Sequence, residues 1–241
     1  MKIYISAFVF ILWSIQVSAQ DFNASLFGCK SDGVTNNVGS IQYAIDYIAK
    51  KGGGTLHFYV GRYVTSGFSL KSNVHIELHE GAVLVGSSNI YDYQQIDGRY
   101  TLISGVGQQN IQIKGLGVID GQSKALALHV RSLKEKGLLS SEFAMDKVSQ
   151  LYFSKTSNIA IEGIMQINSL GALNSFVDCQ SIKLRKLEIN SPQSNAVVLL
   201  NSSQVNLSDL FFKSTKQALV QEGTNSNVLK TNCLLANGKS I

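Results

Sequence analysis

The sequence predicts an all-β protein built as a parallel β-helix, and two observations lead to this prediction. First, Asn158, Ser181, Gln204 and Asn227 each precede an apolar residue, and they follow one another at intervals of 23 residues (181−158, 204−181 and 227−204). Second, apolar and polar residues alternate inside each copy, which is the two-residue period of a strand with one buried face. Repeats of this length with β periodicity are typical of a solenoid, in which each coil pairs with the next.

A leucine-rich repeat is the main alternative architecture for repeats of this size. It requires a helical or 3₁₀ segment after each strand, whereas residues 190–203 are typical of a turn, a strand and another turn. The last copy is weaker, because Lys230 takes the place of the Ile161, Leu184 and Leu207 column. This copy leaves a strand edge uncovered, which predicts self-association at the last coil or a sequence that is a fragment of a longer relative.

Residues 1–19 are typical of a secretory signal peptide. Lys2 is followed by an apolar run from Ile3 to Val17 and then by Val17-Ser18-Ala19, which has the small residues of a cleavage site. The alternative is a retained membrane anchor, for which the run is shorter than the roughly 20 residues that a spanning helix needs. We expect export to the periplasm or the extracellular space, with no membrane association after cleavage.

The mature chain is expected to form one domain with an N-terminal cap. Residues 20–54 predict an amphipathic helix that covers the first coil. Its apolar positions are Ile41, Ala44, Ile45 and Ile48. The β-helix is expected to occupy residues 55–241, with early strands at 74–78 and 82–86. Residues 124–150 lose the strand alternation and predict an irregular, partly helical insertion on the side of the stack.

Composition limits the partners and cofactors that can be expected. The formal net charge is +5, and the densest basic cluster, Lys183, Arg185 and Lys186, lies on the outward face of a strand. It has no helix-turn-helix, zinc or aromatic stacking context, so no nucleic acid partner is expected. The 3 cysteines are too few for a disulfide framework, and no Cys or His pair has metal-ligand spacing. We expect buried or free thiols, no metal and no cofactor.

The first half of the mature chain contains a series of glycine-rich motifs whose order is specific enough to compare with known families. The motifs are Phe27-Gly28-Cys29-Lys30-Ser31-Asp32-Gly33, Gly52-Gly53-Gly54-Thr55, Leu70-Lys71-Ser72-Asn73-Val74, Glu80-Gly81-Ala82 and Gly117-Val118-Ile119-Asp120-Gly121-Gln122. In this order they resemble the opening of the polygalacturonase family, glycoside hydrolase family 28. The resemblance implies a right-handed parallel β-helix. It also implies a pectic, galacturonate-containing polysaccharide or oligogalacturonide as the partner.

The second half resembles this family in its coils but not at the positions of the family's chemistry. The family's Asn-Thr-Asp turn aligns with Asn195 at its aspartate, and the family's Asp-Asp pair aligns with Lys216 and Gln217. The chain ends at or before the Gly-His-Gly motif, and Arg-x-Lys is absent. Inverting hydrolysis needs a protonated and an ionised carboxyl about 6.5–9.5 Å apart. Since an amide does not titrate and lysine is a cation near neutral pH, the alignment assigns no catalytic residue.

Three functions stay open at this point. The first is a pectin-directed hydrolase that uses other residues, and the second is a carbohydrate-binding pseudoenzyme. The third is a structural or adhesive β-helix, or a non-functional remnant. For substrate binding, Lys216 is the candidate partner of a galacturonate carboxylate. Tyr91 and Tyr93 are the candidates for stacking against a sugar ring.

The remaining acids and histidines are interpreted structurally. Asp32 and Asp120 lie beside glycines in turns, where side-chain bonds to the backbone are common. Glu222 and the other acids of the repeats are expected on the surface. His57 and His79 lie on early strands or turns, far from the aligned positions.

Overall fold

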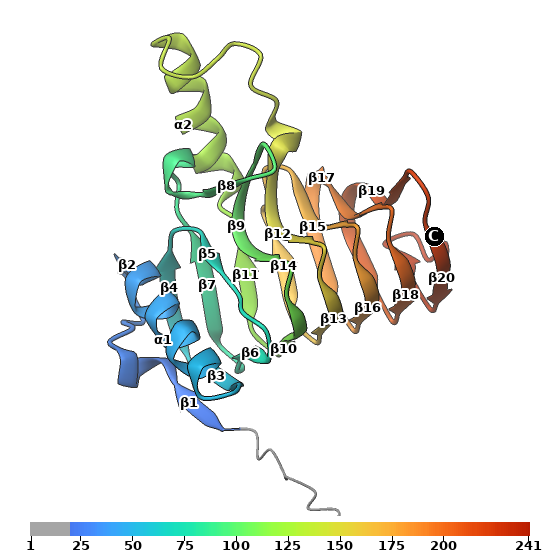
Figure 1. The fold of residues 1–241 in the computed structure, drawn as a ribbon. Coiled ribbons are helices and arrows are strands. Elements are labelled where there is room, and N and C mark those ends of the chain that lie inside the picture. The colour runs from blue at the N-terminus through green and yellow to red at the C-terminus, as the bar shows by residue number, and fades with distance from the viewer. Residues whose placement is uncertain (1–19) are drawn as a thin grey trace, which may run out of the picture.

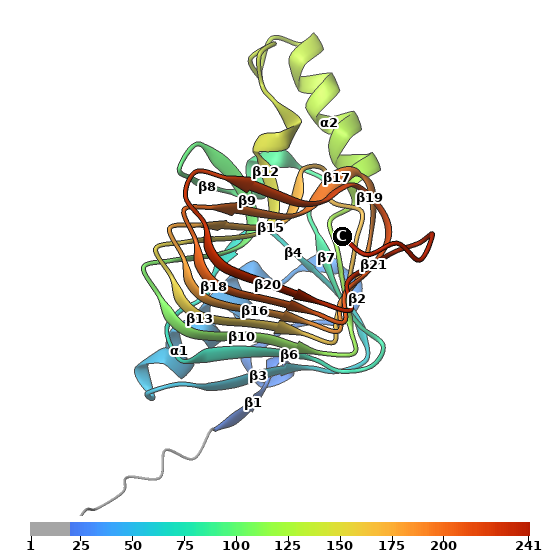
Figure 2. The ribbon, with the colours of Figure 1, turned by 90° about the vertical axis from the view of Figure 1, so that its right-hand side faces the viewer.

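The computed structural model describes residues 20–241, and the expected signal peptide lies outside the described residues. The chain winds into a stack of coils whose strands run parallel, as Figure 1 shows from the side and Figure 2 along the stack. Viewed from the C-terminal end, the chain turns anticlockwise as it approaches the viewer (Figure 2), which is a right-handed winding. The predicted right-handed parallel β-helix is therefore confirmed.

The first face is an eight-stranded parallel sheet in the order β1-β3-β6-β10-β13-β16-β18-β20. Its strands are β1 (Asp21–Asn23), β3 (Gly54–Phe58), β6 (Val74–Leu78), β10 (Gln109–Gly115), β13 (Ser157–Glu162), β16 (Gln180–Arg185), β18 (Ser203–Ser208) and β20 (Ser226–Thr231). Ile159 pairs with Ile182, Ile182 with Val205, and Val205 with Val228. The 23-residue repeat in the sequence is thus the length of one coil.

A second, 13-stranded sheet forms the other two faces, which meet in its longest strands. One face contains β2 (Asp32–Asn36), β4 (Gly61–Thr65), β7 (Ala82–Gly86), β11 (Val118–Asp120) and β14 (Met165–Ile167). The other contains β5 (Phe68–Ser69), β8 (Gln94–Ile96), β9 (Arg99–Val106), β12 (Val148–Ser154) and β15 (Ala172–Val177). The strands β17 (Glu188–Leu200) and β19 (Phe211–Glu222) belong to both faces, and β21 (Leu234–Leu235) pairs with β19.

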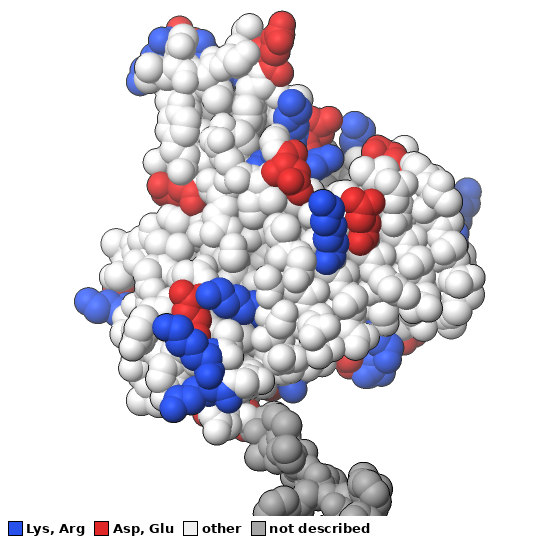
Figure 3. Space-filling model, viewed as in Figure 1, with Lys and Arg blue, Asp and Glu red and all other residues white. Residues whose placement is uncertain are grey.

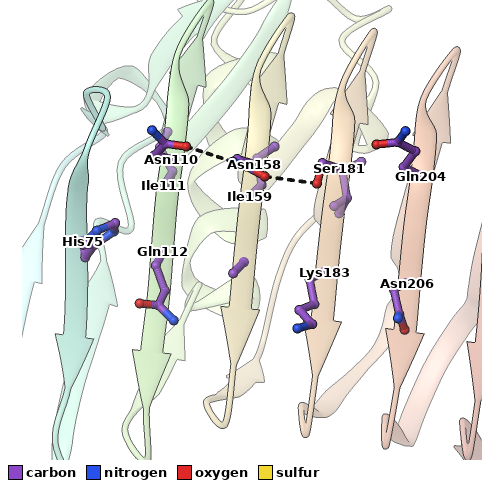
Figure 4. Close-up of a pocket in the computed structure, with 12 residues that line it drawn as sticks. His75, Asn110, Ile111, Gln112, Asn158, Ile159, Ser181, Lys183, Gln204 and Asn206 are labelled. Atoms are coloured by element: carbon purple, nitrogen blue, oxygen red, sulfur yellow. Dashed lines mark hydrogen bonds between the residues drawn. The ribbon is translucent and has the colours of Figure 1, made fainter. Parts of the chain in front are cut away.

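The residues that open the strands of the first face have left-handed backbone conformations. Asn73, Asn110, Asn158, Ser181 and Gln204 have φ values between 55° and 64°. Asparagine tolerates this conformation better than most residues, which explains why polar residues recur at these positions. Their side chains also form a ladder, with Asn158 Nδ2 donating to Asn110 Oδ1 at 2.9 Å and Ser181 Oγ to Asn158 Oδ1 at 3.1 Å (Figure 4).

Helices lie at the ends and the side of the stack. The amphipathic helix α1 (Val38–Lys50) lies over the first coils (Figure 1), and its four predicted apolar residues are fully buried. A second helix, α2 (Ser123–Glu135), projects from the flank and leads into a long loop that returns at β12 (Figure 1). Three 3₁₀ segments are η1 (Ala24–Phe27), η2 (Ile90–Asp92) and η3 (Met145–Lys147). No helix among residues 20–241 is long and apolar enough to cross a membrane.

The core consists of apolar columns that continue from coil to coil. Ile113, Ile161, Leu184 and Leu207 are successive register partners and are 0% exposed. The next partner in this column is Lys230, which is exposed on β20. Two other predictions are confirmed, because β6 and β7 match the strands expected at 74–78 and 82–86 and all three cysteines are free and buried.

Candidate functional site

A cleft follows the flank of the stack where β17 and β19 bend, at the base of the segment that α2 begins. A first hollow of the cleft has a volume of about 310 Å³. Residues of this first hollow include Arg99, Asp146, Gln193, Asn195, Lys216 and Glu222. A second hollow of about 390 Å³ shares Leu170 and Gln193 with it. A third hollow shares Lys124 and Asn168 with the second, and we refer to the three together as the cleft.

The cleft extends over four successive coils. Asp120 pairs with Ile167 and Ile167 with Asn190, and these positions lie in or beside the second and third hollows. The fourth coil contributes Lys216 on β19, which lines the first hollow. Neighbouring strands are about 4.8 Å apart, so three intervals give a length of roughly 14 Å. A site of this shape suits an extended chain better than a single small molecule.

An irregular register between β17 and β19 shapes the first hollow. Ser191 pairs with Thr215 and Asn195 with Gln217, which leaves three residues between the pairs on β17 and only Lys216 on β19. The 23-residue interval found in the sequence would pair Asn195 with Ala218, so the register expected from it is wrong by one residue here. The reason is that the extra residues of β17 form a projection, so the offset between paired residues falls from 24 at Ser191 to 22 at Asn195.

Buried serines hold this projection in place. The Ser194 hydroxyl donates to the Ser169 carbonyl at 2.6 Å, and the Ser191 hydroxyl donates to the same carbonyl at 3.1 Å. The Ser169 amide in turn donates to Ser191 Oγ at 2.9 Å. All three residues are at most 3% exposed, so these hydrogen bonds are protected from water. The neighbouring Asn195 is thereby held at a defined place in the cleft wall.

Buried amides form a second polar network within the same coils. The amide of Asn174 donates to Gln166 Oε1 at 2.8 Å, and that of Gln166 donates back to Asn174 Oδ1 at 3.2 Å. The Gln150 amide donates to the carbonyls of Ile119 and Ile167 at 3.2 and 3.1 Å. Because all three side chains are buried, these bonds fix how the coils stack at this flank.

Arg99 is oriented by the residues around it. Its Nη1 donates to the Asp146 carbonyl at 3.3 Å, and its guanidinium lies 6.0 Å from the centre of the Tyr152 ring. The Tyr152 hydroxyl donates to Asp97 Oδ2 at 2.8 Å. Burial raises the pKa of Tyr152 to about 12, so this phenol stays protonated and keeps donating at neutral pH. Arg99 is therefore positioned before any ligand arrives.

The cleft carries both signs of charge. Its cations are Arg99, Lys124 and Lys216, and within residues 20–241 none of them has a carboxylate within 4.0 Å. Asp146 and Glu222 supply carboxylates in the first hollow. In the view of Figure 3, acidic and basic side chains lie side by side between the projecting helix and the stack, while most of the face carries neither. The cleft thus offers separate partners for carboxylates and for hydroxyl groups.

The structure brings together some of the residues that the sequence singled out. Asn195 and Lys216 line the first hollow, and Gln217 is the register partner of Asn195 on the next strand. The Asn195 Oδ1 atom is buried, and no hydrogen-bond donor of the described residues reaches it. A hydroxyl group or a water molecule in the cleft would satisfy this acceptor.

The two tyrosines do not line the cleft. Tyr93 is 5% exposed, so its ring cannot stack against a sugar, and burial raises the pKa of its hydroxyl. Tyr91 is half exposed, but its hydroxyl donates to the Leu138 carbonyl at 2.7 Å and fastens the loop after α2. Asp120 accepts from the Gln122 amide and from Asn168 Nδ2, both at 3.0 Å, which supports its predicted turn role.

Arg99 and Asp146 were missed by sequence reasoning. Arg99 begins β9, and Asp146 lies in η3 at the end of the inserted segment. The lost strand alternation at 124–150 signals an insertion, but it does not show that the returning end of the loop enters the wall of the cleft. Glu222 was expected on the surface and is exposed, yet it faces the same hollow as Lys216.

Fold and cleft together define a parallel β-helix protein with an elongated cleft along its coils. Residues 57–241 match the family described as Glycosyl hydrolases family 28, and the chain belongs to this family. The family relation predicted from the N-terminal motifs is confirmed.

Three comparisons illustrate the relation. An exo-poly-alpha-D-galacturonosidase of Dickeya chrysanthemi is 25% identical over 90% of this chain and 40% of its own length. A candidate glycosyl hydrolase from Parabacteroides merdae ATCC 43184 is 35% identical with a TM-score of 0.86, over 91% of this chain and 99% of that one. The family 28 exopolygalacturonase of Yersinia enterocolitica is 20% identical with a TM-score of 0.73, over 87% and 49%, which shows the fold. The chain thus spans less than half the length of the Dickeya relative.

Proposed function

We propose that this protein binds pectic, galacturonate-containing chains in the cleft and does not hydrolyse them. The observation that carries the proposal is that Asn195 and Lys216 line the cleft of a family 28 β-helix, with Gln217 paired to Asn195 on the neighbouring strand. These are the positions where the family resemblance expects aspartates. Amides and an ammonium group cannot supply the proton donor and the ionised base that glycoside hydrolysis needs.

The cleft supports binding of an acidic sugar chain by its length and its free cations. Lys216 and Arg99 are available to carboxylates, and the orphaned Asn195 Oδ1 is available to a hydroxyl. The printed descriptions of the Dickeya and Yersinia relatives name galacturonosidase and exopolygalacturonase activity, which supports galacturonate as the sugar. Asp146 and Glu222 lie among these cations, so we expect a moderate affinity that does not depend on net charge alone.

Two measurements test this proposal. In calorimetric titrations, a galacturonate oligomer should bind saturably, while an uncharged galactose oligomer of equal length should bind at least tenfold more weakly. In a reducing-sugar assay on polygalacturonate, the protein should release no more reducing ends than a heat-denatured sample. The Asn195→Asp/Gln217→Asp variant is assayed in parallel. Release of reducing ends by the unaltered protein would contradict the loss of hydrolysis, and equal affinity for both oligomers would contradict the ligand class.

A second candidate function, hydrolysis by other residues, is favoured by one observation. Asp146 and Glu222 line the same hollow, so two carboxylates are present beside the proposed ligand position. If they act as acid and base, Glu222→Gln abolishes the release of reducing ends and leaves oligomer binding within about twofold. If the protein only binds, the unaltered chain already shows no release.

Export and self-association belong to the same proposal. The signal-like residues 1–19 support export to the periplasm or beyond, where pectic polymers are met. The one-sided pairing of β20 within the described chain supports association of coils through this edge. Cell fractionation tests the first, and sedimentation of the protein over a hundredfold concentration range tests the second.

A further inference from the structure

Two histidines and a glutamate gather on the outer face of the first coils, away from the residues that line the cleft. His57 on β3 is the register partner of Glu77 on β6, and His79 directly follows β6. One possible ligand atom from each of the three lies within 4.8 Å of the others. Two imidazoles and one carboxylate are a ligand set that proteins use for zinc, with water as the fourth ligand.

The distances leave room for a metal ion after small side-chain rotations. His57 Nδ1 and His79 Nε2 are 2.9 Å apart, Glu77 Oε1 is 4.0 Å from His79 Nε2, and Glu77 Oε2 is 3.9 Å from His57 Nδ1. Tetrahedral zinc with bonds of about 2.0–2.2 Å places its ligand atoms roughly 3.4 Å apart. The two nitrogens would therefore separate by about half an ångström, and the carboxylate would approach by a similar amount.

Asp21 holds His57 in the orientation that a metal requires. Its Oδ1 lies 3.1 Å from His57 Nε2, on the opposite side of the ring from the cluster. When this nitrogen donates to the carboxylate, Nδ1 keeps its lone pair and directs it toward His79 and Glu77. A carboxylate bonded to the outer nitrogen of a ligating histidine is a recurring feature of zinc sites.

The surroundings leave one side of the cluster partly open. Tyr59 stacks on His79 with ring centres 4.4 Å apart and planes inclined by 14°. The side chains of His57, Glu77 and His79 are 14%, 24% and 33% exposed, so a water ligand can reach the site. Lys114 Nζ lies 3.2 Å from Glu77 Oε2 and competes for that oxygen, which leaves Oε1 for the metal.

We propose that His57, His79 and Glu77 bind one zinc ion, with Asp21 as a positioning residue. The ion would join β3 to the end of β6, and through Asp21 it would also fasten the three-residue strand β1 to the first coil. In the absence of such an ion, the short contact between the two imidazoles is a hydrogen bond in which one ring donates. A measurable affinity for zinc therefore distinguishes a metal site from a cluster held only by this hydrogen bond.

The test is a zinc titration of tag-free protein that has been stripped with a chelator. Calorimetry with a competing chelator should find one equivalent of zinc bound, and thermal unfolding should shift upward with zinc concentration because the ion binds the folded state. His79→Gln should lower the affinity at least a hundredfold, and Asp21→Asn should lower it 10–100-fold. His75→Gln is the matched control, because His75 lies on β6 together with Glu77. This substitution should change the zinc affinity less than twofold.

A spectroscopic readout separates folding from binding. Cobalt added to the stripped protein should give the visible absorption of a four-coordinate site, and the bands should disappear in His57→Gln and His79→Gln, whose circular dichroism shows whether they are folded. Lack of a saturable zinc site below about 100 μM would overturn the proposal, since structural and catalytic zinc sites bind far more tightly. Full affinity in a folded His79→Gln variant would overturn it as well.

Discussion

The replacement of Lys216 by glutamine is the most direct perturbation of the cleft. It keeps most of the side-chain length and removes the charge at the point where β19 faces the projection of β17. Lys216 is exposed, and no carboxylate of residues 20–241 lies within 4.0 Å of its ammonium group. An ion pair at such an exposed position contributes about 0.2–1 kcal/mol.

This free energy converts into a moderate change in affinity. Since 1.4 kcal/mol is a factor of ten, the Kd of a galacturonate oligomer should rise up to about fivefold. Raising the salt concentration from 0.1 to 1 M shortens the Debye length from about 10 to about 3 Å, and it should remove most of the difference between variant and unaltered protein. Calorimetric titration at both salt concentrations measures the two effects.

Lys183→Gln is the matched control for this experiment. Lys183 is also exposed, but it lies on the outer side of the first face rather than in the cleft (Figure 4). It should leave the Kd unchanged within error. Equal effects of the two substitutions, or a Lys216 effect that persists at 1 M salt, would refute the assignment of Lys216 to a galacturonate carboxylate.

Three further predictions concern stability and protonation. Phe176→Ala, which breaks a fully buried stack, should lower the free energy of unfolding by about 3–5 kcal/mol, against less than 0.5 for exposed Leu229→Ala, as read from denaturant midpoints. Asn174→Leu should cost roughly 2–3 kcal/mol because it leaves buried amide partners unsatisfied, and an unchanged midpoint would contradict this. Hydrogen bonds from the Thr35 side chain and from the Thr35 and Val34 backbones lower the pKa of Asp32 to about 2. The contribution of Asp32 to stability is therefore complete above pH 3.8 and is lost as the pH falls toward 2. An NMR titration of the carboxyl that gives an ordinary midpoint would contradict this.

The repeating part of the protein could be predicted because each coil packs on the next one at a fixed interval in the sequence. The 23-residue interval is the length of one coil, and the alternation inside each copy shows which side chains point inward. The apolar stripe of α1 also has a regular period, so the covering helix and its buried residues could be recognised. In each case a periodic pattern corresponds to one buried face.

The cleft was predicted only in part, because its walls come from irregular segments. Asn195 and Lys216 were found by their position in the coils, but the offset of 22 between Asn195 and Gln217 depends on how the projection of β17 packs on buried serines. Asp146 reaches the cleft only when the loop after α2 folds back, and there its carbonyl accepts a hydrogen bond from Arg99 of β9. A loop has no period from which this return could be deduced.

The sequence by itself determined the winding, the coil length, the covering helix and the absence of titratable groups at Asn195 and Gln217, because these follow from residue identity and period. Only the tertiary structure decided which distant residues meet. His57 and His79 are 22 residues apart, a spacing that resembles no short metal motif, yet one coil of the stack brings their nitrogens to 2.9 Å. In a solenoid, neighbours in space lie one coil apart in sequence, and the side chains that share a site depend on small local changes in coil length that appear only when the coils are packed.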